Sequence, residues 1–226
     1  MMDSNKLKIL CLHGYGQNGE YFRQKMGGIR KQWKNFAELE FISAPHLIQH
    51  AGENDDPDAG ARLAWWFTDM EARTYESKVF NTNCYGFEDS VKLVESTIQE
   101  KGPYDGILGF SQGACFLSLL CCLQQKGVLQ GTFKFAIFTS GYLSRCTDHQ
   151  SVYSVGEVEI PTLHVYGETD SVITADMSDA LMETCNDKQI IRHPGGHYMP
   201  SNSHFREGYL NFLRRRYAEK TECPER

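Results

Sequence analysis

Residues 109–113 read Gly-Phe-Ser-Gln-Gly, a G-x-S-x-G sequence whose central hydroxyl, on Ser111, could act as a nucleophile. The motif follows a short apolar run and opens a helical pattern, which is the strand–turn–helix setting of a nucleophile elbow. A glycine on each side of the serine would let the backbone turn sharply and leave Oγ exposed above the sheet. The N–H of Gln112 would then lie at a helix N-terminus, where it favours a developing oxyanion. We therefore expect Ser111 to perform nucleophilic catalysis.

A nucleophilic serine needs a base and a carboxylate that orients the base, and both have candidates after later strands. In an α/β-hydrolase the order along the chain is serine, acid, histidine. The apolar run TLHVY is followed by Glu168 and Asp170, and we favour Asp170 because its shorter side chain suits a loop tip that faces the elbow. The run KQIIR is followed by His193 and His197. We favour His197, which a Gly-Gly pair can carry over the sheet, and keep Glu168 and His193 as alternatives.

A second glycine-rich segment, His13 to Gly19, ends the first apolar run and permits two interpretations. Read as Gly14-x-Gly16-x-x-Gly19, it fits the dinucleotide-binding fingerprint. Read as the loop after an early strand, it would donate a backbone N–H to an oxyanion hole, and the ring nitrogens of His13 would tie that loop. A dinucleotide site also needs a carboxylate at the end of the next strand, whereas Glu40 lies inside that strand. The hydrolase is therefore preferred, and a dinucleotide-binding oxidoreductase is the alternative.

The elements that must position these residues alternate along the chain. Buried parallel strands are predicted at 7–12, 105–110, 133–139 and 162–166, with weaker candidates at 38–42 and 188–192. Helical patterns lie at 19–31, 87–100, 112–125, 176–185 and 204–217. This alternation predicts an α/β fold, with a mostly parallel sheet of about six strands and helices on both faces. Because no repeat or linker divides the chain, residues 1–226 are expected to form a single domain.

One stretch, residues 44–86, departs from the alternation and shows little regular pattern. Its first half is acidic and contains proline and glycine, whereas its second half is rich in aromatic residues, beginning with Trp65, Trp66 and Phe67. Structureless segments of this length inside compact domains are usually functional or disordered. Two interpretations stay open for the rings: they cover the sheet as core residues, or some of them line a substrate pocket near the active site.

Composition excludes several classes of protein. The 226 residues carry 23 basic and 29 acidic side chains, a formal net charge of −6. Acidity without a basic cluster argues against nucleic acid and anionic membranes as partners. No apolar run reaches the roughly 18–20 residues of a membrane span, and the N-terminal apolar stretch is too short for a signal peptide. The eight cysteines contain no C-x-x-C pair, and we expect them to be reduced, in a cytoplasmic protein for which a nuclear location is also compatible.

His46 and His50 have the i, i+4 spacing of two metal ligands on one helix, and Asp55 and Asp56 follow them. Proline and glycine around these residues disfavour a helix, and without a helix the two histidines would not share one face, so no metal site is expected there. The triad chemistry itself requires neither a metal nor an organic cofactor, and none is predicted.

Four sequence blocks resemble one family. LCLHGYGQNGEYF, GPYDGILGFSQGA, HVYGETDSVI and GGHYMP are similar to segments of the FSH-type serine hydrolases of the α/β-hydrolase superfamily. The resemblance implies an α/β-hydrolase fold and a serine carboxylesterase that acts on carboxylic esters with apolar, medium to long alkyl chains. By motif matching, it implies Ser111 as nucleophile, Asp170 as acid and His197 as base. It also implies that the N–H groups of Tyr15 and Gln112 supply the oxyanion hole.

The expected substrate is thus a small-molecule ester, and the sequence indicates no protein partner. An acyl thioesterase is the alternative within the same class, because it uses the same triad. Acyl-CoA would usually need basic residues for its phosphates, and none cluster near the motifs. A binding protein without catalysis is the third possibility, and labelling by a fluorophosphonate probe separates it, and an oxidoreductase, from the hydrolases.

Overall fold

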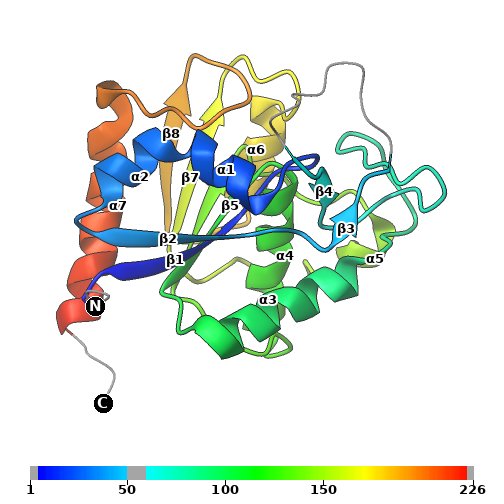
Figure 1. The fold of residues 1–226 in the computed structure, drawn as a ribbon, viewed down its shortest axis with the longest axis horizontal. Coiled ribbons are helices and arrows are strands. Elements are labelled where there is room, and N and C mark those ends of the chain that lie inside the picture. The colour runs from blue at the N-terminus through cyan, green and yellow to red at the C-terminus, as the bar shows by residue number, and fades with distance from the viewer. Residues whose placement is uncertain (1–4, 50–59, 223–226) are drawn as a thin grey trace.

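A six-stranded parallel sheet forms the centre of the protein (Figure 1). The computed structural model describes residues 5–49 and 60–222. The strands are ordered β2-β1-β5-β6-β7-β8. Their bounds are β1 (Leu7–Leu12), β2 (Ala37–Ile42), β5 (Gly106–Phe110), β6 (Phe135–Thr139), β7 (Thr162–Gly167) and β8 (Lys188–His193). The predicted α/β fold with about six strands is confirmed.

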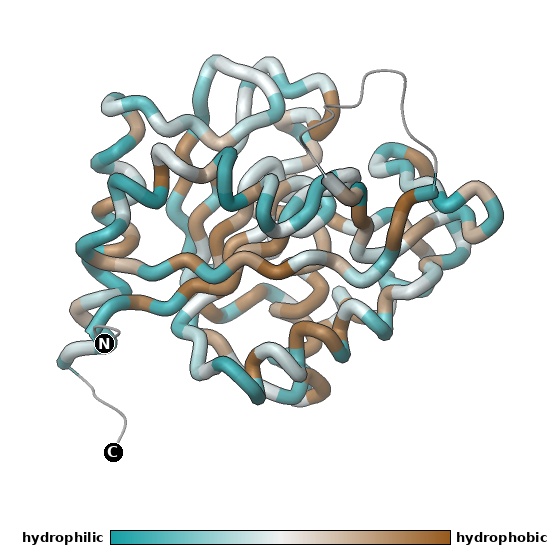
Figure 2. The backbone as a smooth tube through the Cα atoms, in the orientation of Figure 1, coloured by the Kyte–Doolittle hydropathy of each residue, from teal (hydrophilic) through white to brown (hydrophobic). Residues whose placement is uncertain are grey.

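Helices cover both faces of the sheet, and each face has its own apolar core. In β1, Ile9 and Cys11 join the core under α1 (Gly19–Lys25), α2 (Gly27–Trp33) and α7 (Ser203–Glu222), whereas Leu10 and Leu12 join the other core. That second core lies under α3 (Phe87–Lys101), α4 (Gln112–Gln125) and α6 (Ala175–Met182). The alternation follows from the two-residue period of a strand. The central strands are accordingly apolar on both faces, as the brown colour inside the sheet in Figure 2 shows.

The structure corrects one predicted helix and adds a short one that was not predicted. The pattern at 19–31 predicted one helix, but the structure has two, α1 and α2, which meet at Met26. Gly27 and Gly28 follow this break, and glycine is a weak helix former, which explains why the helix is interrupted there. A short helix, α5 (Thr147–Gln150), was not predicted because four residues carry too little periodicity to be seen.

The insertion at 44–86 contains more order than its sequence pattern indicates. Strands β3 (His46–Leu47) and β4 (Leu63–Ala64) pair antiparallel in a small second sheet. His46 donates from Nε2 to the carbonyl of Gly86, 2.8 Å away, and so has a structural partner. His50, Asp55 and Asp56 lie outside the described residues. Figure 1 shows β3 and β4 beside α4, at the end of the sheet where β1 and β5 finish.

The strand order reverses at β1. The chain passes from β1 to its neighbour β2 and then crosses back to β5 on the other side of β1. In open α/β sheets such a switch point marks the crevice, beyond the carboxyl ends of the strands, where ligands bind. Here the two strands at this point lead into the two glycine motifs. Among the described helices, none combines the length and apolar character needed to cross a bilayer.

Candidate active site

Ser111 occupies a strained turn between β5 and α4. Its backbone has φ 52° and ψ −117°, and positive φ is uncommon for a residue with a Cβ. The flanking glycines are sterically required, because a Cβ on Gly109 would lie 2.4 Å from the carbonyl oxygen of Gly113. A Cβ on Gly113 would lie 2.4 Å from the carbonyl oxygen of Leu12. The turn therefore has the geometry expected for a nucleophile elbow.

Asp170 and His197 are brought together from loops that follow adjacent strands, β7 and β8. Nδ1 of His197 lies 2.7 Å from Oδ2 of Asp170. The other carboxylate oxygen, Oδ1, accepts the backbone N–H groups of Val172 and Ile173, each at 2.9 Å. Both oxygens of the carboxylate are thus fixed, and the imidazole that they orient is only partly exposed.

A fourth side chain, Ser140, contacts the carboxylate from the loop after β6. Its hydroxyl donates to Oδ2 of Asp170 over 3.0 Å, and the side chain is buried. The backbone of Ser140 also has positive φ, 46°. Sequence reasoning did not identify this residue, because it is 30 positions from Asp170 and belongs to no motif. Its non-glycine positive φ, which could have drawn attention to it, is visible in the structure alone.

The electrostatic balance at Asp170 favours the ionised form. Burial by itself would raise the pKa of this carboxyl group. Hydrogen bonds from His197, the Ile173 N–H and Ser140 outweigh the burial, and the pKa lies below its ordinary value. The carboxylate is therefore an acceptor at neutral pH, so Nδ1 of His197 carries the hydrogen and Nε2 presents its lone pair.

The two alternative residues lie elsewhere. Glu168 is exposed at the surface of the same loop. His193, the last residue of β8, is buried with its ring centroid 4.9 Å from that of Tyr198. Burial lowers the pKa of His193, which favours the neutral ring expected of a core histidine. The pairing of Asp170 with His197, which was favoured over both alternatives, is the one that the structure contains.

The imidazole of His197 packs against the ring of Phe110, the residue before the serine. The ring centroids of His197 and Phe110 are 4.8 Å apart. Within the described part of the chain, the imidazole has one side-chain hydrogen bond, to Asp170, and none to Ser111. Such contacts are often long in free enzymes and shorten when a substrate binds. The base candidate thus contacts the residue that precedes the nucleophile candidate.

The loop from His13 to Gly16 passes directly over the elbow. A Cβ on Gly14 would lie 3.3 Å from Cβ of Ser111, which places the backbone of this loop against the serine. The imidazole of His13 holds the loop, because Nε2 accepts the N–H of Ala44 at 2.9 Å and Nδ1 donates to the carbonyl of Gly14 at 2.7 Å. Burial lowers the pKa of His13 to about 4, so the ring is neutral at pH 7. The prediction that both ring nitrogens of His13 hold this loop by hydrogen bonds is confirmed.

Gln112 connects the elbow to the aromatic insertion. Its side-chain oxygen accepts the N–H of Trp65 at 3.0 Å, and its side-chain nitrogen donates to the carbonyl of Trp66 at 2.9 Å. Nε1 of Trp65 in turn donates to the carbonyl of His13 at 2.8 Å. The insertion, the elbow and the glycine loop are therefore joined by buried hydrogen bonds. Because Gln112 begins α4, its own N–H points out of the helix N-terminus.

The three rings proposed as pocket residues are buried in the structure. Trp65 and Trp66 are 0% exposed and Phe67 is 3% exposed. Trp65 stacks on Phe116 of α4, with centroids 5.1 Å apart, and Trp66 lies edge-on to Phe87. This burial favours the core interpretation of the rings, and a contact with substrate is a prediction for experiment.

The dinucleotide interpretation of the glycine loop is not favoured by the structure. The carboxylate of Glu40, the one candidate for the ribose hydroxyls, accepts the phenol of Tyr104 at 2.7 Å. It also pairs with Lys101 at 3.2 Å and with Lys8 at 3.6 Å. Because these three neighbours already bind the carboxylate, Glu40 is not available for a nucleotide.

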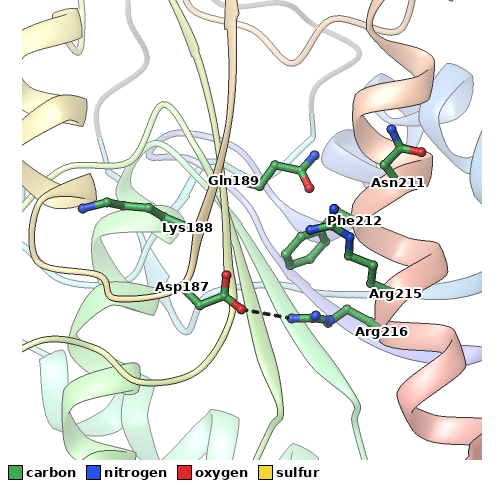
Figure 3. Close-up of a pocket in the computed structure, with 7 residues that line it drawn as sticks. All are labelled: Asp187, Lys188, Gln189, Asn211, Phe212, Arg215 and Arg216. Carbon is green, nitrogen blue, oxygen red and sulfur yellow. Dashed lines mark ion pairs between the residues drawn. The ribbon is translucent and has the colours of Figure 1, made fainter.

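A pocket of about 270 Å³ lies at the opposite end of the strands from this site (Figure 3). It lies between the amino end of β8 and α7 and is lined by Asp187, Lys188, Gln189, Asn211, Phe212, Arg215 and Arg216. Asp187 and Arg216 pair across it at 3.8 Å. Ligands of open α/β sheets bind at the carboxyl ends of the strands, so the substrate site is expected at the other end, around Ser111.

Some known proteins are similar to this chain in sequence, and others are similar in fold. The sequence profile of the family described as Serine hydrolase (FSH1) matches residues 2–209. Esterase OVCA2 of Danio rerio is 40% identical over 225 residues, covering 95% of this chain and 99% of the relative. An esterase of Anopheles gambiae is 42% identical over 223 residues, covering 97% of this chain and 82% of the relative. Among solved structures, acyl-protein thioesterase 2 of Zea mays has a TM-score of 0.63 at 17% identity, covering 94% of each chain.

Proposed function

The chain belongs to the FSH1 family of serine hydrolases and is a carboxylic ester hydrolase, and from this premise we propose that Ser111, His197 and Asp170 form its catalytic triad. The observation that carries the proposal is the 2.7 Å contact between His197 and Asp170, in loops beside the strained turn of Ser111. That arrangement supplies a nucleophile, a base and the group that orients the base.

The proposed reaction follows from these positions. Nε2 of His197 removes the proton from Oγ of Ser111, and Oγ attacks the ester carbonyl. The negative oxygen of the tetrahedral intermediate accepts the N–H groups of Tyr15 and Gln112. When the intermediate collapses, the C–O bond to the alcohol breaks, and the imidazolium of His197 returns the proton to the alcohol. A water molecule, deprotonated by the same imidazole, then hydrolyses the acyl-enzyme and restores Ser111.

Ionised Asp170 contributes by stabilising one tautomer and the charged form of the base. With Nδ1–H held by Oδ2, Nε2 is the nitrogen that can accept a proton. When the imidazolium forms, the nearby negative charge of Asp170 stabilises it. The four hydrogen bonds that Asp170 accepts keep this carboxylate in place during both half-reactions.

We propose that the preferred substrates carry apolar alkyl chains of medium to long length. Large apolar side chains that are exposed concentrate in the insertion, where they are Leu47, Met70, Val79, Phe80 and Tyr85. Phe80 also borders a pocket of about 230 Å³ whose other apolar lining comes from Tyr142, Leu143, Met177 and Ala180. Tyr142, which lines this pocket, lies two residues after Ser140, and Ser140 contacts Asp170; we propose that the pocket receives the acyl chain.

The experiment is a series of esters of increasing acyl length, assayed as kcat/KM. Each methylene that enters an apolar slot contributes up to about 0.8 kcal/mol, so kcat/KM should rise up to about fourfold per methylene until the slot is full. Phe80→Ala should flatten this rise and leave acetyl-ester hydrolysis nearly intact, because the side chain is 77% exposed and contributes little to the fold. Val128→Ala, at an exposed position three residues beyond the end of α4, is the matched control.

The variants Trp65→Ala, Trp66→Ala and Phe67→Ala are assayed with the same series of esters. Loss at every chain length together with a lowered melting temperature would assign these rings to the core alone. A flattened slope with intact acetyl-ester hydrolysis would give one of them a pocket role. If wild type shows no dependence on chain length, the apolar-chain preference is wrong.

Acyl thioesters are the alternative substrates, because the triad chemistry is the same and the fold is shared with an acyl-protein thioesterase. Acyl thioesters of matched chain length, assayed beside the esters, decide between the two. We further propose a reducing compartment such as the cytoplasm as the place of action. The seven cysteines of the described part of the chain are free thiols, which supports that location.

A further inference from the structure

A group of metal-ligating side chains lies apart from the triad, where the end of the insertion meets α5. Cys84 belongs to the insertion, whereas Cys146 and His149 are separated by two residues at α5. One ligand atom from each residue, the two sulfurs and a ring nitrogen, lies within 4.8 Å of the others. Asp148 adds a carboxylate oxygen 3.9 Å from the sulfur of Cys84. The cluster thus brings together sequence positions more than 60 residues apart.

The backbone around the cluster holds the two segments in register. Asn81 donates its N–H to the carbonyl of Arg145 at 3.2 Å and accepts the N–H of Thr147 at 2.8 Å. These bonds place Cys84, three residues beyond Asn81, opposite the start of α5. Cys146 is the N-cap of α5 and His149 is the third residue of that helix, and their ligand atoms lie within 4.8 Å of each other.

The spacing of the three ligand atoms is close to that of a tetrahedral zinc site. Zn–S bonds of about 2.3 Å and Zn–N bonds of about 2.0 Å put neighbouring ligand atoms about 3.6–3.8 Å apart. The observed limit of 4.8 Å therefore requires an inward movement of about 1 Å, which side-chain rotations can supply. A site made of two thiolates and an imidazole binds Zn²⁺ in preference to Mg²⁺ or Ca²⁺.

The His149 ring provides an independent indication of a ligand. The residue is 1% exposed, and its Nδ1 lies 2.8 Å from the hydroxyl of Ser144. Its Nε2 is buried and has no hydrogen-bond partner among the described residues. Buried polar atoms are nearly always satisfied, so an unpartnered nitrogen in this cluster needs an explanation. In zinc sites, one nitrogen of a histidine binds the metal and the other commonly bonds to an outer group, a role that Ser144 can fill.

We propose that Cys84, Cys146 and His149 bind a zinc ion, with Asp148 or a water molecule in the fourth position. The bound ion joins the aromatic insertion to the loop that follows β6. His149 packs on Phe87, with ring centroids 4.3 Å apart, and lies edge-on to Trp66 at 5.5 Å. Gln112 of the elbow bonds to the backbone of Trp66, so zinc at this point stabilises the packing of the insertion against the elbow without entering the reaction.

The test is a titration of the reduced, chelator-treated full chain with Co²⁺ alone, followed by Zn²⁺. We expect thiolate-to-cobalt charge-transfer absorption that saturates at one equivalent and disappears when Zn²⁺ displaces the cobalt. Cys84→Ser should abolish the signal, and because Cys84 is half-buried, this variant is expected to fold. Cys146→Ser should behave in the same way. Cys185→Ser changes a buried thiol outside the cluster and should leave the absorption unchanged.

Zinc should also raise the melting temperature of wild type and of Cys185→Ser, but not that of Cys84→Ser, because an ion that binds the folded state stabilises it. The proposal is overturned if the reduced protein gives no charge-transfer absorption, or if Cys84→Ser binds Co²⁺ as wild type does. It is also overturned if Cys84 and Cys146 form a disulfide under the same reducing conditions, found as a loss of two hydrogens in the intact mass.

Discussion

Nδ1 of His197 and Oδ2 of Asp170 are 2.7 Å apart, although 27 residues separate them in the chain. The contact exists because β7 and β8 are neighbouring parallel strands, so the loops that follow them leave the sheet at the same edge. The elbow follows β5 at this edge as well. A parallel sheet thus gathers the acid, the base and the nucleophile by topology, and short loops complete the geometry.

The histidine assignment is tested by comparing His197→Ala with His193→Ala. The first removes the imidazole that is bonded to Asp170, and we expect kcat to fall about as far as in a serine variant, by roughly 10⁶-fold. His193 packs against Tyr198 in the core, so its loss should lower stability more than kcat. Steady-state kinetics and thermal melts on both proteins are the measurements. An exchange of the two phenotypes would show that the base is His193.

The acid assignment is tested by Asp170→Asn. An amide would hold the His197 ring in the wrong tautomer, and we expect kcat to fall by about 10⁴-fold, the size of this effect in a serine protease. Glu168→Gln, in the same loop but exposed, is the matched control and should keep nearly full activity. A large loss in Glu168→Gln with a silent Asp170→Asn would reverse the assignment.

Gln112 is expected to matter for stability through its side chain. Gln112→Ala leaves the Trp65 N–H and the Trp66 carbonyl buried without partners, at a cost of about 1–3 kcal/mol for each group. The free energy of unfolding, measured by urea denaturation, should fall by roughly 2–6 kcal/mol. Gln125→Ala removes an amide that also bonds to backbone carbonyls, but near the surface, and should cost less than 1 kcal/mol. Equal losses in the two variants would contradict the bridging role of Gln112.

Stability should decrease in mild acid because burial lowers the pKa of several histidines, among them His13 and His164. Burial lowers the pKa of His13 to about 4 and that of His164 to about 3, from an ordinary value of 6.5. The unfolded chain therefore binds more protons between pH 6.5 and 4, and the stabilisation that is complete above pH 6.5 is lost as the pH falls. Each histidine contributes a slope of up to about 1.4 kcal/mol per pH unit.

Urea midpoints between pH 7.5 and 4.5 measure this slope. His164→Gln removes one of these groups and should give a shallower dependence on pH, whereas His204→Gln, at an exposed position, should match wild type. A flat profile for wild type would mean that these rings bind protons equally in the folded and unfolded states, so that their pKa values are not lowered by folding.

Local signals explain which features could be predicted from the sequence. The run at 7–12 and the helix at 112–125 have the bounds that were expected, because apolar periodicity and the glycines of the elbow are encoded within a few residues. The order serine, acid, histidine indicated Asp170 and His197, because the first follows the strong strand pattern at 162–166 and the second the weaker pattern at 188–192. These predictions needed no knowledge of which distant segments touch.

Features that depend on distant contacts were missed. The hydroxyl of Ser140 reaches Asp170 from another loop, and Gln112 bonds to backbone groups 46 and 47 residues away. Trp65 and Trp66 carry the same apolar signal whether they line a pocket or fill the core, and only their packing on α4 distinguishes the two. The Cys84, Cys146 and His149 cluster likewise exists only after the insertion has folded onto α5.

The central claim is that Ser111 is the nucleophile of a serine esterase, and one comparison tests it most directly. Wild type and Ser111→Ala are treated with a fluorophosphonate probe and assayed for ester turnover. We expect wild type to be labelled on Ser111, and Ser111→Ala to keep the wild-type melting temperature while losing labelling and roughly 10⁶-fold in kcat. A Ser111→Ala protein that is still labelled, or that keeps more than about one per cent of the wild-type kcat, would contradict the claim.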